Sequence, residues 1–297
     1  MTPPPLTVGL PVYNGAAFLQ PALESVLGQT FGDLRLVISD NGSTDETQDI
    51  CRAFAERDDR VTYVRHEVNR GAAWNYNTVF ELATSPYFKW AAADDLVAPT
   101  FVERCLEAIV AAPPTVALCY PRAVVIDAEG TLIREQDDEL DVRATRPHRR
   151  LYRVLLNVVY GNPTFGVARR ELLARTRLHG NYPSADWVLL AELALAGEIW
   201  ELPDRLFLRR EHAGTSRVAT ADLQELAEWF DPAAPPIKSE HRKLLVEFLA
   251  GIRHADLTPT DRALSYAALA AAWTRRHSWL SRRAREALGR RRARRSR

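Results

Sequence analysis

Four short apolar runs, each followed by a segment of helical periodicity, constrain the fold of this chain more than any other feature. The runs are rich in β-branched residues and largely unbroken, as is typical of strands buried on both faces. They cover Leu6 to Val12, Leu34 to Ser39, Val61 to Arg65 and Tyr87 to Ala92. The helical patterns cover Ala16 to Leu27, Thr44 to Arg57, Gly71 to Ala83 and Pro99 to Ala111. This alternation predicts an α/β fold with a mostly parallel, Rossmann-like central sheet, flanked by helices and joined by right-handed crossovers.

The pattern changes after Pro113-Pro114. Two apolar segments around Glu129-Gly130 predict a β-hairpin, and the charged segment from Gln136 to Arg150 predicts a mobile loop. Further on, we expect helices at Leu151 to Tyr160 and Trp187 to Ala196 and a strand at Leu206 to Arg210. Residues 231–237, with three prolines, mark a boundary before two more expected helices, Glu240 to Ile252 and Asp261 to Trp273.

The composition is that of an ordinary globular protein. The chain has 297 residues, of which 46% are hydrophobic and 26% charged, with a formal net charge of +1. Its cysteines, Cys51, Cys105 and Cys119, have no metal-site spacing, so we expect reduced, half-buried thiols. The first five residues do not resemble a signal peptide, and no window approaches the roughly eighteen apolar residues of a membrane span. The expected location is therefore the cytoplasm.

Polar and glycine-containing segments follow all four predicted strands. They are Pro11 to Gly15 (P-V-Y-N-G), Asp40 to Asp45 (D-N-G-S-T-D), Asn69 to Asn75 (N-R-G-A-A-W-N) and Asp94-Asp95. Any one of them is more simply explained as a turn. Because ligands bind beyond the carboxyl ends of strands in an open parallel sheet, four together predict a binding site.

The pair Asp94-Asp95 is the sharpest of these signals. Two adjacent carboxylates repel each other and are costly beside an apolar sheet unless a cation neutralises them. Oxygen ligands of this kind suit Mg²⁺ or Mn²⁺, which commonly bridge carboxylates to substrate phosphates. The alternative is that the pair only favours the start of the helix near Thr100 electrostatically. The pair alone leaves both interpretations open.

The four segments, in this order and spacing, resemble the family-2 glycosyltransferases with the GT-A fold. The resemblance covers roughly Leu6 to Arg217. It implies a nucleotide-sugar donor whose base and ribose lie against Pro11, Tyr13 and Asn14. It further implies a hydrogen bond from the base to Asp40, and contacts of the nucleotide with Arg70 and Gly71.

The same resemblance assigns roles to the acidic pair. Asp94 would contact the ribose or the water shell of the metal, and Asp95 would bind the Mn²⁺ or Mg²⁺ that holds the diphosphate. Many members of the family carry a further aspartate two residues before the pair, where this chain has Ala92. Since the last two carboxylates are usually the working ones, we expect the metal site to be retained.

The second half of the chain is expected to supply the residues that bind the acceptor and the catalytic base. Gly161 to Gly166 resembles the family segment that reaches the acceptor. A loop that only connects a helix to a strand would have the same sequence pattern. By the resemblance, Asp186 is the catalytic base. Family members usually have two acids there, whereas Ala185 precedes Asp186 in this chain. Without the resemblance, an aspartate at a helix start is more often a cap.

His212 lies among arginines in the segment Arg209 to Arg217. This composition suits a lid over a diphosphate, and the resemblance implies that His212 binds the donor and completes the metal shell. A lone exposed histidine without such a role is the alternative.

These roles predict a single direct displacement, and therefore an inverting glycosyltransferase. Its donor would be a nucleotide-diphosphate sugar, and its acceptor a glycan or lipid-linked hydroxyl in cell-envelope or other polysaccharide biosynthesis. Residues 1–218 would form the GT-A domain, with 1–112 on the donor side and 113–218 on the acceptor side. Residues 219–297 would form a helical C-terminal extension. Two alternatives are a non-catalytic nucleotide- or glycan-binding scaffold and a sugar nucleotidyltransferase. The second lacks the basic, glycine-rich loop that it needs after the first strand.

An arginine-rich tail ends the chain. From Arg275 onward it holds eleven of the 39 basic residues and only one of the 38 acidic ones, Glu286. As an amphipathic basic helix it would be attracted to an anionic membrane surface by about 1 kcal/mol per arginine near the surface. A solvated end is the alternative. No nucleic-acid-reading motif accompanies the tail, so we expect no nucleic-acid partner.

Overall fold

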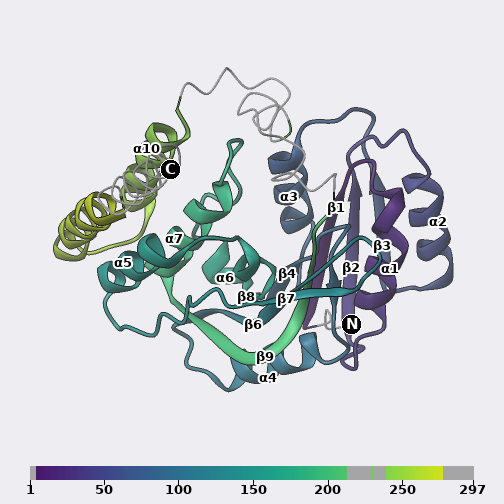
Figure 1. Cartoon of the computed structure of the whole chain (residues 1–297), viewed down its shortest axis with the longest axis horizontal. Coiled ribbons are helices and arrows are strands. Elements are labelled where there is room, and N and C mark those ends of the chain that lie inside the picture. Colours follow the sequence, from purple (N-terminus) through teal and green to yellow (C-terminus); the bar gives the residue numbers. More distant parts are fainter. Residues whose placement is uncertain (1–4, 213–228, 230–238, 277–297) are drawn as a thin grey trace, which may run out of the picture.

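The computed structural model describes residues 5–212, 229 and 239–276, and within them the chain forms one curled, mixed sheet between two layers of helices (Figure 1). The strand order is β3-β2-β1-β4-β8-β6-β9-β5, with β7 paired to β6. The strands of the first half are β1 (Leu6–Val12), β2 (Leu34–Asp40), β3 (Val61–Arg65), β4 (Tyr87–Trp90) and β5 (Leu96–Val97). Those of the second half are β6 (Val116–Ile126), β7 (Leu132–Gln136), β8 (Val167–Arg169) and β9 (Glu198–Arg210).

The first half of the sheet confirms the parallel prediction. β1 pairs in parallel with β2 and β4, and β2 pairs in parallel with β3. The short antiparallel strand β8 joins this half to β6, which then runs parallel to the long strand β9. The predicted strand Leu206–Arg210 is only the end of β9. The carboxyl ends of β1 and β2 lie side by side, since Val12 is paired with Asp40.

Each face of the sheet is covered by its own set of helices and its own apolar core. On one face lie α1 (Ala16–Leu27), α2 (Thr47–Arg57) and α4 (Phe101–Ala111). On the other lie α3 (Ala72–Glu81), α5 (Pro147–Asn157), α6 (Arg170–Leu173), α7 (Ala185–Ala196) and α10 (Glu240–His254). Every residue of β1 is buried, as expected of a strand between two layers.

Helix α3 packs unusually close to β1. A Cβ added to Gly9 in β1 would lie 2.7 Å from Cγ2 of Val79 in α3, so the glycine is needed for the approach. This contact brings the start of α3 to the carboxyl edge of the sheet, where the predicted binding residues lie.

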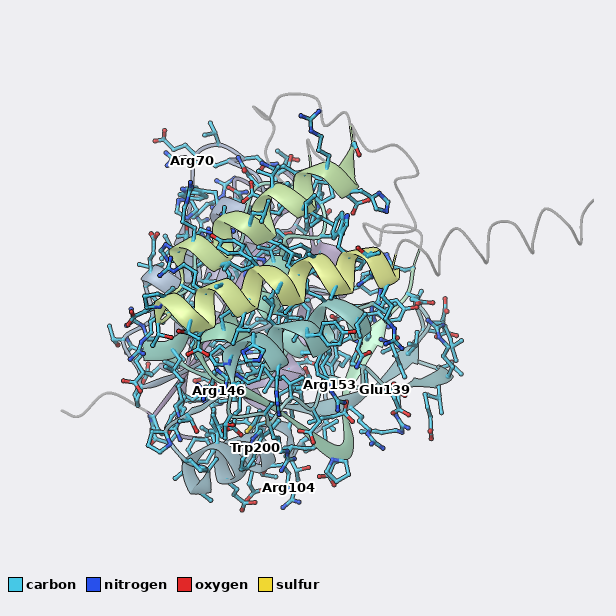
Figure 2. The ribbon with its side chains drawn as sticks, turned by 90° about the vertical axis from the view of Figure 1, so that its left-hand side faces the viewer. Arg70, Arg104, Glu139, Arg146, Arg153 and Trp200 are labelled. Atoms are coloured by element: carbon cyan, nitrogen blue, oxygen red, sulfur yellow. The ribbon has the colours of Figure 1, made fainter. Side chains whose placement is uncertain are left out.

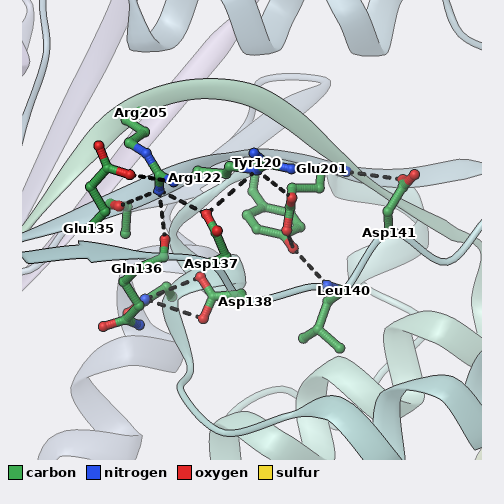
Figure 3. Close-up of polar contacts among 12 residues, drawn as sticks. Tyr120, Arg122, Glu135, Gln136, Asp137, Asp138, Leu140, Asp141, Glu201 and Arg205 are labelled. Carbon is green, nitrogen blue, oxygen red and sulfur yellow. Dashed lines mark hydrogen bonds and ion pairs between the residues drawn. The ribbon is translucent and has the colours of Figure 1, made fainter.

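The prediction of a mobile loop between Gln136 and Arg150 was wrong. Helix α5 begins at Pro147, and Leu140 and Val142 are buried in the core below it. The segment before the helix is tied to β6 and β9 by a polar network (Figure 3). In this network the Tyr120 hydroxyl donates to Glu201 (2.7 Å) and accepts from the Leu140 amide (3.1 Å).

Two helices from the C-terminal part lie side by side over α5 and α7 (Figure 2). They are α10 and residues 259–276, close to the two helices expected there. Their buried side chains belong to the same core as α7, and they include Leu244, Phe248, Ile252, Leu269 and Ala272. The predicted boundaries at 218 and at 231–237 fall outside the described residues. In the described ranges, no helix is both long and apolar enough to cross a membrane.

The three cysteines are free and more deeply buried than expected. Burial raises the pKa of the Cys51 and Cys119 thiols to about 12, and it raises that of Cys105 further. These thiols therefore act as small apolar core residues.

Candidate functional site

A cavity of about 800 Å³ opens at the carboxyl edge of the parallel strands and extends across to the start of α7. Seven of the ten residues predicted for the site line it, namely Pro11, Tyr13, Asn14, Asp94, Asp95, Asp186 and His212. Asp40, Arg70 and Gly71 do not line it. Residues as distant in the sequence as Pro11 and His212 thus line the same cavity.

The loop after β1 is shaped by side chains of the D-N-G-S-T-D segment and by Thr47, the first residue of α2. The backbone amides of Asn14, Gly15 and Ala16 donate to the side chains of Ser43, Thr47 and Asp45, at 2.9, 2.9 and 3.1 Å. In return, Asn14 Oδ1 accepts from the Thr44 amide at 2.8 Å. The segment therefore supplies partners for the start of α1. This use of its residues also explains why α2 begins at Thr47, later than the predicted Thr44.

Asp40 is completely buried beneath this loop. Its carboxylate accepts hydrogen bonds from the Ser43 amide (2.8 Å), the Tyr63 hydroxyl (2.8 Å) and Nε of Arg65 (3.2 Å). These donors engage both of its oxygens, so in this structure Asp40 holds the loop in place. Its predicted bond to a nucleotide base remains a prediction.

The neighbouring Asn41 organises the next loop. Its side chain donates to Asn69 Oδ1 (2.8 Å) and to the Gly71 carbonyl (3.1 Å), and it accepts from the Arg70 amide (3.0 Å). The exposed Arg70 guanidinium lies over the Trp74 ring, 4.8 Å from its centroid. Asn41 and Asn69 line the cavity in place of Arg70 and Gly71.

Asp94 and Asp95 form one wall of the cavity, and β9 holds both. The Arg210 amide donates to Oδ1 of Asp95 (2.8 Å), and the buried Arg210 guanidinium donates through Nε to the Asp94 carbonyl (2.8 Å). His212 Nε2 lies 3.1 Å from Oδ2 of Asp94, and the His212 ring packs on Phe18 at 4.5 Å between centroids. The predicted histidine thus meets the acidic pair, through Asp94.

Burial, followed by the nearby charge of Asp94, raises the pKa of Asp95 to about 8. The carboxylate pair therefore lies where a positive ligand would be stabilised. Within the described ranges, no three His, Cys, Asp or Glu side chains are grouped to hold a metal ion. The side chains present fit an ion that takes one or two protein carboxylates and completes its shell from substrate phosphates and water.

Asp186 lies on another wall, at the start of α7. Its Oδ1 accepts from the Trp187 amide at 3.1 Å, but the N-cap of α7 is Ser184, so the interpretation of Asp186 as the helix cap was wrong. The loop from Gly161 packs directly against it, because a Cβ added to Gly161 would lie 2.8 Å from the Asp186 Cγ. The carboxylate nevertheless remains part of the cavity lining.

The prediction missed two aromatic residues between these walls. Tyr76 of α3 and His179 both line the cavity, with ring centroids 4.8 Å apart. Burial raises the pKa of Tyr76, and the charges of Asp94, Asp95 and Asp186 raise it further. Its phenol therefore lies within the field of all three acids. Burial lowers the pKa of His179 to about 3. No sequence motif marks either residue, since only the packing of α3 on β1 brings Tyr76 here.

Arg209 is a third residue of the cavity without an individual prediction. Its guanidinium lies 4.8 Å from the Tyr160 ring centroid, and one of its terminal nitrogens is buried with no hydrogen-bond partner among the described residues. Its charge lowers the pKa of Asp95 against the effect of burial. Arg209 therefore presents a cation to the cavity close to the acidic pair.

Comparison with known proteins places the chain among sugar-transferring enzymes. The family model described as glycosyl transferase family 2 matches residues 7–176. Glycosyltransferase GlyA of Streptococcus pneumoniae is 33% identical over 105 residues, which is 35% of this chain and 15% of GlyA. An uncharacterized glycosyltransferase of Nostoc sp. is 25% identical over 269 residues, covering 86% of this chain and 78% of that protein. The chain thus matches only a small part of GlyA but most of the Nostoc protein.

Two solved structures share the fold. S. aureus TarS 1–349 in complex with UDP-GlcNAc superposes with a TM-score of 0.63 at 15% identity, covering 89% of this chain and 71% of TarS 1–349. The mannosyltransferase PcManGT from Pyrobaculum calidifontis, in complex with GDP-Man and Mn²⁺, gives a TM-score of 0.53 at 19% identity. That match covers 97% of this chain and 81% of PcManGT. These likenesses confirm the GT-A fold expected from the sequence.

Proposed function

The chain belongs to glycosyl transferase family 2, and from that membership we propose that it moves a sugar from a nucleotide diphosphate to an acceptor hydroxyl with inversion at the anomeric carbon. One observation carries the proposal: a single cavity is lined by Asp94-Asp95 and by Asp186. In this proposal residues 1–112 bind the donor, and residues 113–218 supply the acceptor side.

At the donor end, Asp95, supported by Asp94, would hold a Mn²⁺ or Mg²⁺ ion together with the donor diphosphate. Two features favour this. Burial raises the pKa of Asp95, and PcManGT, which shares the fold, is in complex with GDP-Man and Mn²⁺. Such an ion supplies Lewis-acid stabilisation of the leaving diphosphate.

Arg209 and His212 would bind the diphosphate from the same side. Arg209 has a buried terminal nitrogen that donates to no other residue in the described part of the chain, and guanidinium groups recognise phosphate oxygens with paired hydrogen bonds. His212, now beside Asp94, would reach the same oxygens at the mouth of the cavity. The nucleotide would lie along Pro11, Tyr13 and Asn14, and Tyr13 is 45% exposed, leaving its ring available for contact.

At the acceptor end, Asp186 would remove the proton of the attacking hydroxyl. The hydroxyl oxygen forms a bond to the anomeric carbon while the bond from that carbon to the diphosphate oxygen breaks. The bonding electrons leave with the diphosphate, and the proton goes to Asp186. One displacement on one base gives inversion. UDP-GlcNAc and GDP-Man, the ligands of the two structural relatives, are the first donors to test.

For the acceptor we propose a glycan or a lipid-linked sugar of the cell envelope. We further propose that the arginine-rich tail, from Arg275 onward, contacts an anionic membrane surface. The full chain should float with anionic vesicles, and the chain without residues 277–297 should not. Equal flotation of both forms would contradict the membrane contact.

The donor proposal is tested by a thermal-shift screen of nucleotide diphosphates and their sugars, with Mn²⁺ or with EDTA. Specific binding stabilises the folded state by mass action, so one nucleotide should raise the melting temperature, and more strongly with Mn²⁺. The matching sugar nucleotide is then incubated with the enzyme, and nucleotide diphosphate release is measured. Binding without release would instead favour the non-catalytic scaffold.

Asp186→Asn should lower the rate of sugar transfer and leave donor binding unchanged. The amide cannot accept the proton, so release should fall by about a hundredfold or more, the usual contribution of a general base. The melting-temperature shift caused by the donor should stay within error of the wild type, because Asp186 lies on another wall from the acidic pair. Wild-type turnover in this variant would show that another group is the base.

A further inference from the structure

We propose that the C-terminal extension positions the catalytic base, with Glu240 and Arg276 as positioning residues that hold the start of α7. The inference rests on the proposed role of Asp186 and adds a part for helices that the matched family region, residues 7–176, does not include. Glu240 contacts Ser184, two residues before Asp186, and Arg276 contacts Trp187, directly after it.

The start of α7 is held from outside the helix. Its N-cap, Ser184, has φ 60° and ψ 27°, a left-handed conformation that is costly for a residue other than glycine. Its side chain makes no capping bond to the helix. The Ser184 hydroxyl instead donates to Oε1 of Glu240, at 2.6 Å, in the first turn of α10. An N-cap serine normally serves its own helix, so the strained turn two residues before Asp186 relies on α10.

Arg276 contacts the residue that follows the proposed base in the chain. Its guanidinium lies over the Trp187 ring, 4.5 Å from the centroid. The same group donates to the carbonyls of Leu155 and Val158, each at 2.9 Å. Those carbonyls belong to the end of α5, shortly before Gly161, which packs against the Asp186 carboxylate. Arg276 therefore joins both segments that define the position of that carboxylate.

The extension is itself firmly attached, so it can act as a support. Arg177 donates to Glu192 of α7 through Nε (2.7 Å), and to Glu247 of α10 (2.8 Å). Glu192 is buried, and Gly251 of α10 packs so closely that an added Cβ would lie 2.8 Å from its Oε1. With the buried apolar side chains of α10, these contacts fix the two helices together independently of Glu240.

The consequence for catalysis follows from the sensitivity of proton transfer to distance. Removing Glu240 should leave α10 attached but release Ser184, so that Asp186 samples more positions. A displacement of about 1 Å in a catalytic group can cost up to a hundredfold in rate. The proposed donor site, formed by the segments after β1 and β4 together with Arg209 and His212, includes no residue of α7 and should be unaffected.

The test compares Glu240→Ala, Ser184→Ala and Arg276→Ala with the wild-type full chain in two measurements. The first is hydrogen exchange of the peptide covering residues 182–192, which needs no substrate. Loss of one such hydrogen bond should speed exchange there by about fivefold to tenfold, with peptides from β1 and α1 unchanged. The second is nucleotide diphosphate release from the donor found in the screen, in which kcat should fall about tenfold with an unchanged donor KM.

Two matched variants complete the design. Glu240→Gln keeps an oxygen that can accept from Ser184, so it should retain most of the wild-type rate. Glu171→Ala removes an exposed acid from the first turn of another helix, α6, and should match the wild type in both measurements. Native exchange and native kcat in the Glu240→Ala and Arg276→Ala variants would overturn the inference. If exchange rises but the wild type and Asp186→Asn release nucleotide equally, the proposed base is wrong and the support of α7 stands.

Discussion

At the scale of the residue, the site depends on positions where there is no room for another atom. Gly161 is the clearest of them, because its Cα faces the side chain of Asp186. An added Cβ would lie 2.8 Å from Cγ and 3.1 Å from Cβ of that residue, and closer still to Oδ2. Real Cβ atoms avoid such contacts, so one of the two groups has to move.

Gly161→Ala should therefore reduce turnover by about tenfold to a hundredfold, through displacement of the Asp186 carboxylate. Donor binding, measured by the thermal shift with nucleotide, should stay at the wild-type level. Gly32→Ala is the matched control, since Gly32 is exposed and an added Cβ would meet only an arginine nitrogen at 3.9 Å. Full turnover in the Gly161 variant would mean that the position of Asp186 does not limit the reaction.

At the scale of the element, helix α3 connects the cavity to the sheet. Asn75, in its first half, is buried against the ends of two strands. Its Nδ2 donates to the carbonyls of Val12 (3.2 Å) and Ser39 (2.9 Å), and its Oδ1 accepts from the Ser39 hydroxyl (2.6 Å). One side chain thus satisfies backbone and side-chain groups of β1 and β2 at the edge where the donor is expected.

Asn75→Leu should destabilise the protein by about 2–4 kcal/mol, because it removes three buried hydrogen bonds and leaves the Ser39 hydroxyl with only its contact to His66 Nε2 (2.9 Å). At about 2–4 °C per kcal/mol, the melting temperature should fall by roughly 5–15 °C. Gln20→Leu, the same type of change on the exposed face of α1, is the control and should shift it little. A melting temperature equal to that of the control would contradict this role for Asn75.

Elements of the first half could be predicted well, because their burial on two faces leaves a strong local pattern. β1 and β3 match their predicted bounds, and α1 does so as well. The segment before α5 could not be predicted. Its charged residues look solvated, but Asp137 pairs with Arg205 of β9 at 2.8 Å (Figure 3), a partner distant in sequence.

The residues of the candidate site also divide into those with a local sequence signal and those without one. Adjacent acids at a strand end carry a local signal, so Asp94 and Asp95 could be selected, whereas Asp186 could be selected only through the resemblance to the family. Tyr76 and His179 carry none, because packing between distant elements brings them to the cavity, and Arg209 was marked only as part of the arginine-rich segment Arg209 to Arg217. Asp40 belongs to the D-N-G-S-T-D motif and was therefore selected, yet both oxygens of its carboxylate accept hydrogen bonds within the protein, from Ser43, Tyr63 and Arg65.

At the scale of the whole molecule, stability depends on pH through acids buried between the elements. Asp138 is 7% exposed, and Asn162 donates to both of its oxygens at 3.2 and 3.3 Å. Burial raises its pKa from 3.8 to about 6. Between these values the folded chain keeps a proton that the unfolded chain releases, so this group's contribution to stability falls as the pH rises from about 4 to about 6.

Asp138→Asn should remove this dependence, because the amide oxygen still accepts from Asn162 but carries no charge. The difference between the two pKa values corresponds to roughly 3 kcal/mol, so the variant should melt several degrees above the wild type at pH 7.5. Near pH 4 the two should melt together. Asp59→Asn, at an exposed position, is the control. A constant difference between Asp138→Asn and wild type at both pH values would contradict the assigned titration.

The buried cysteines have a practical consequence for measurement. All three thiols of the chain are in the core with raised pKa values, so thiol-directed dyes should not react with them in the folded protein. A single cysteine introduced on the surface, for example at Arg253 of α10, could then be labelled in an otherwise native background. Fluorescence from such a label would follow the extension in real time while the donor binds.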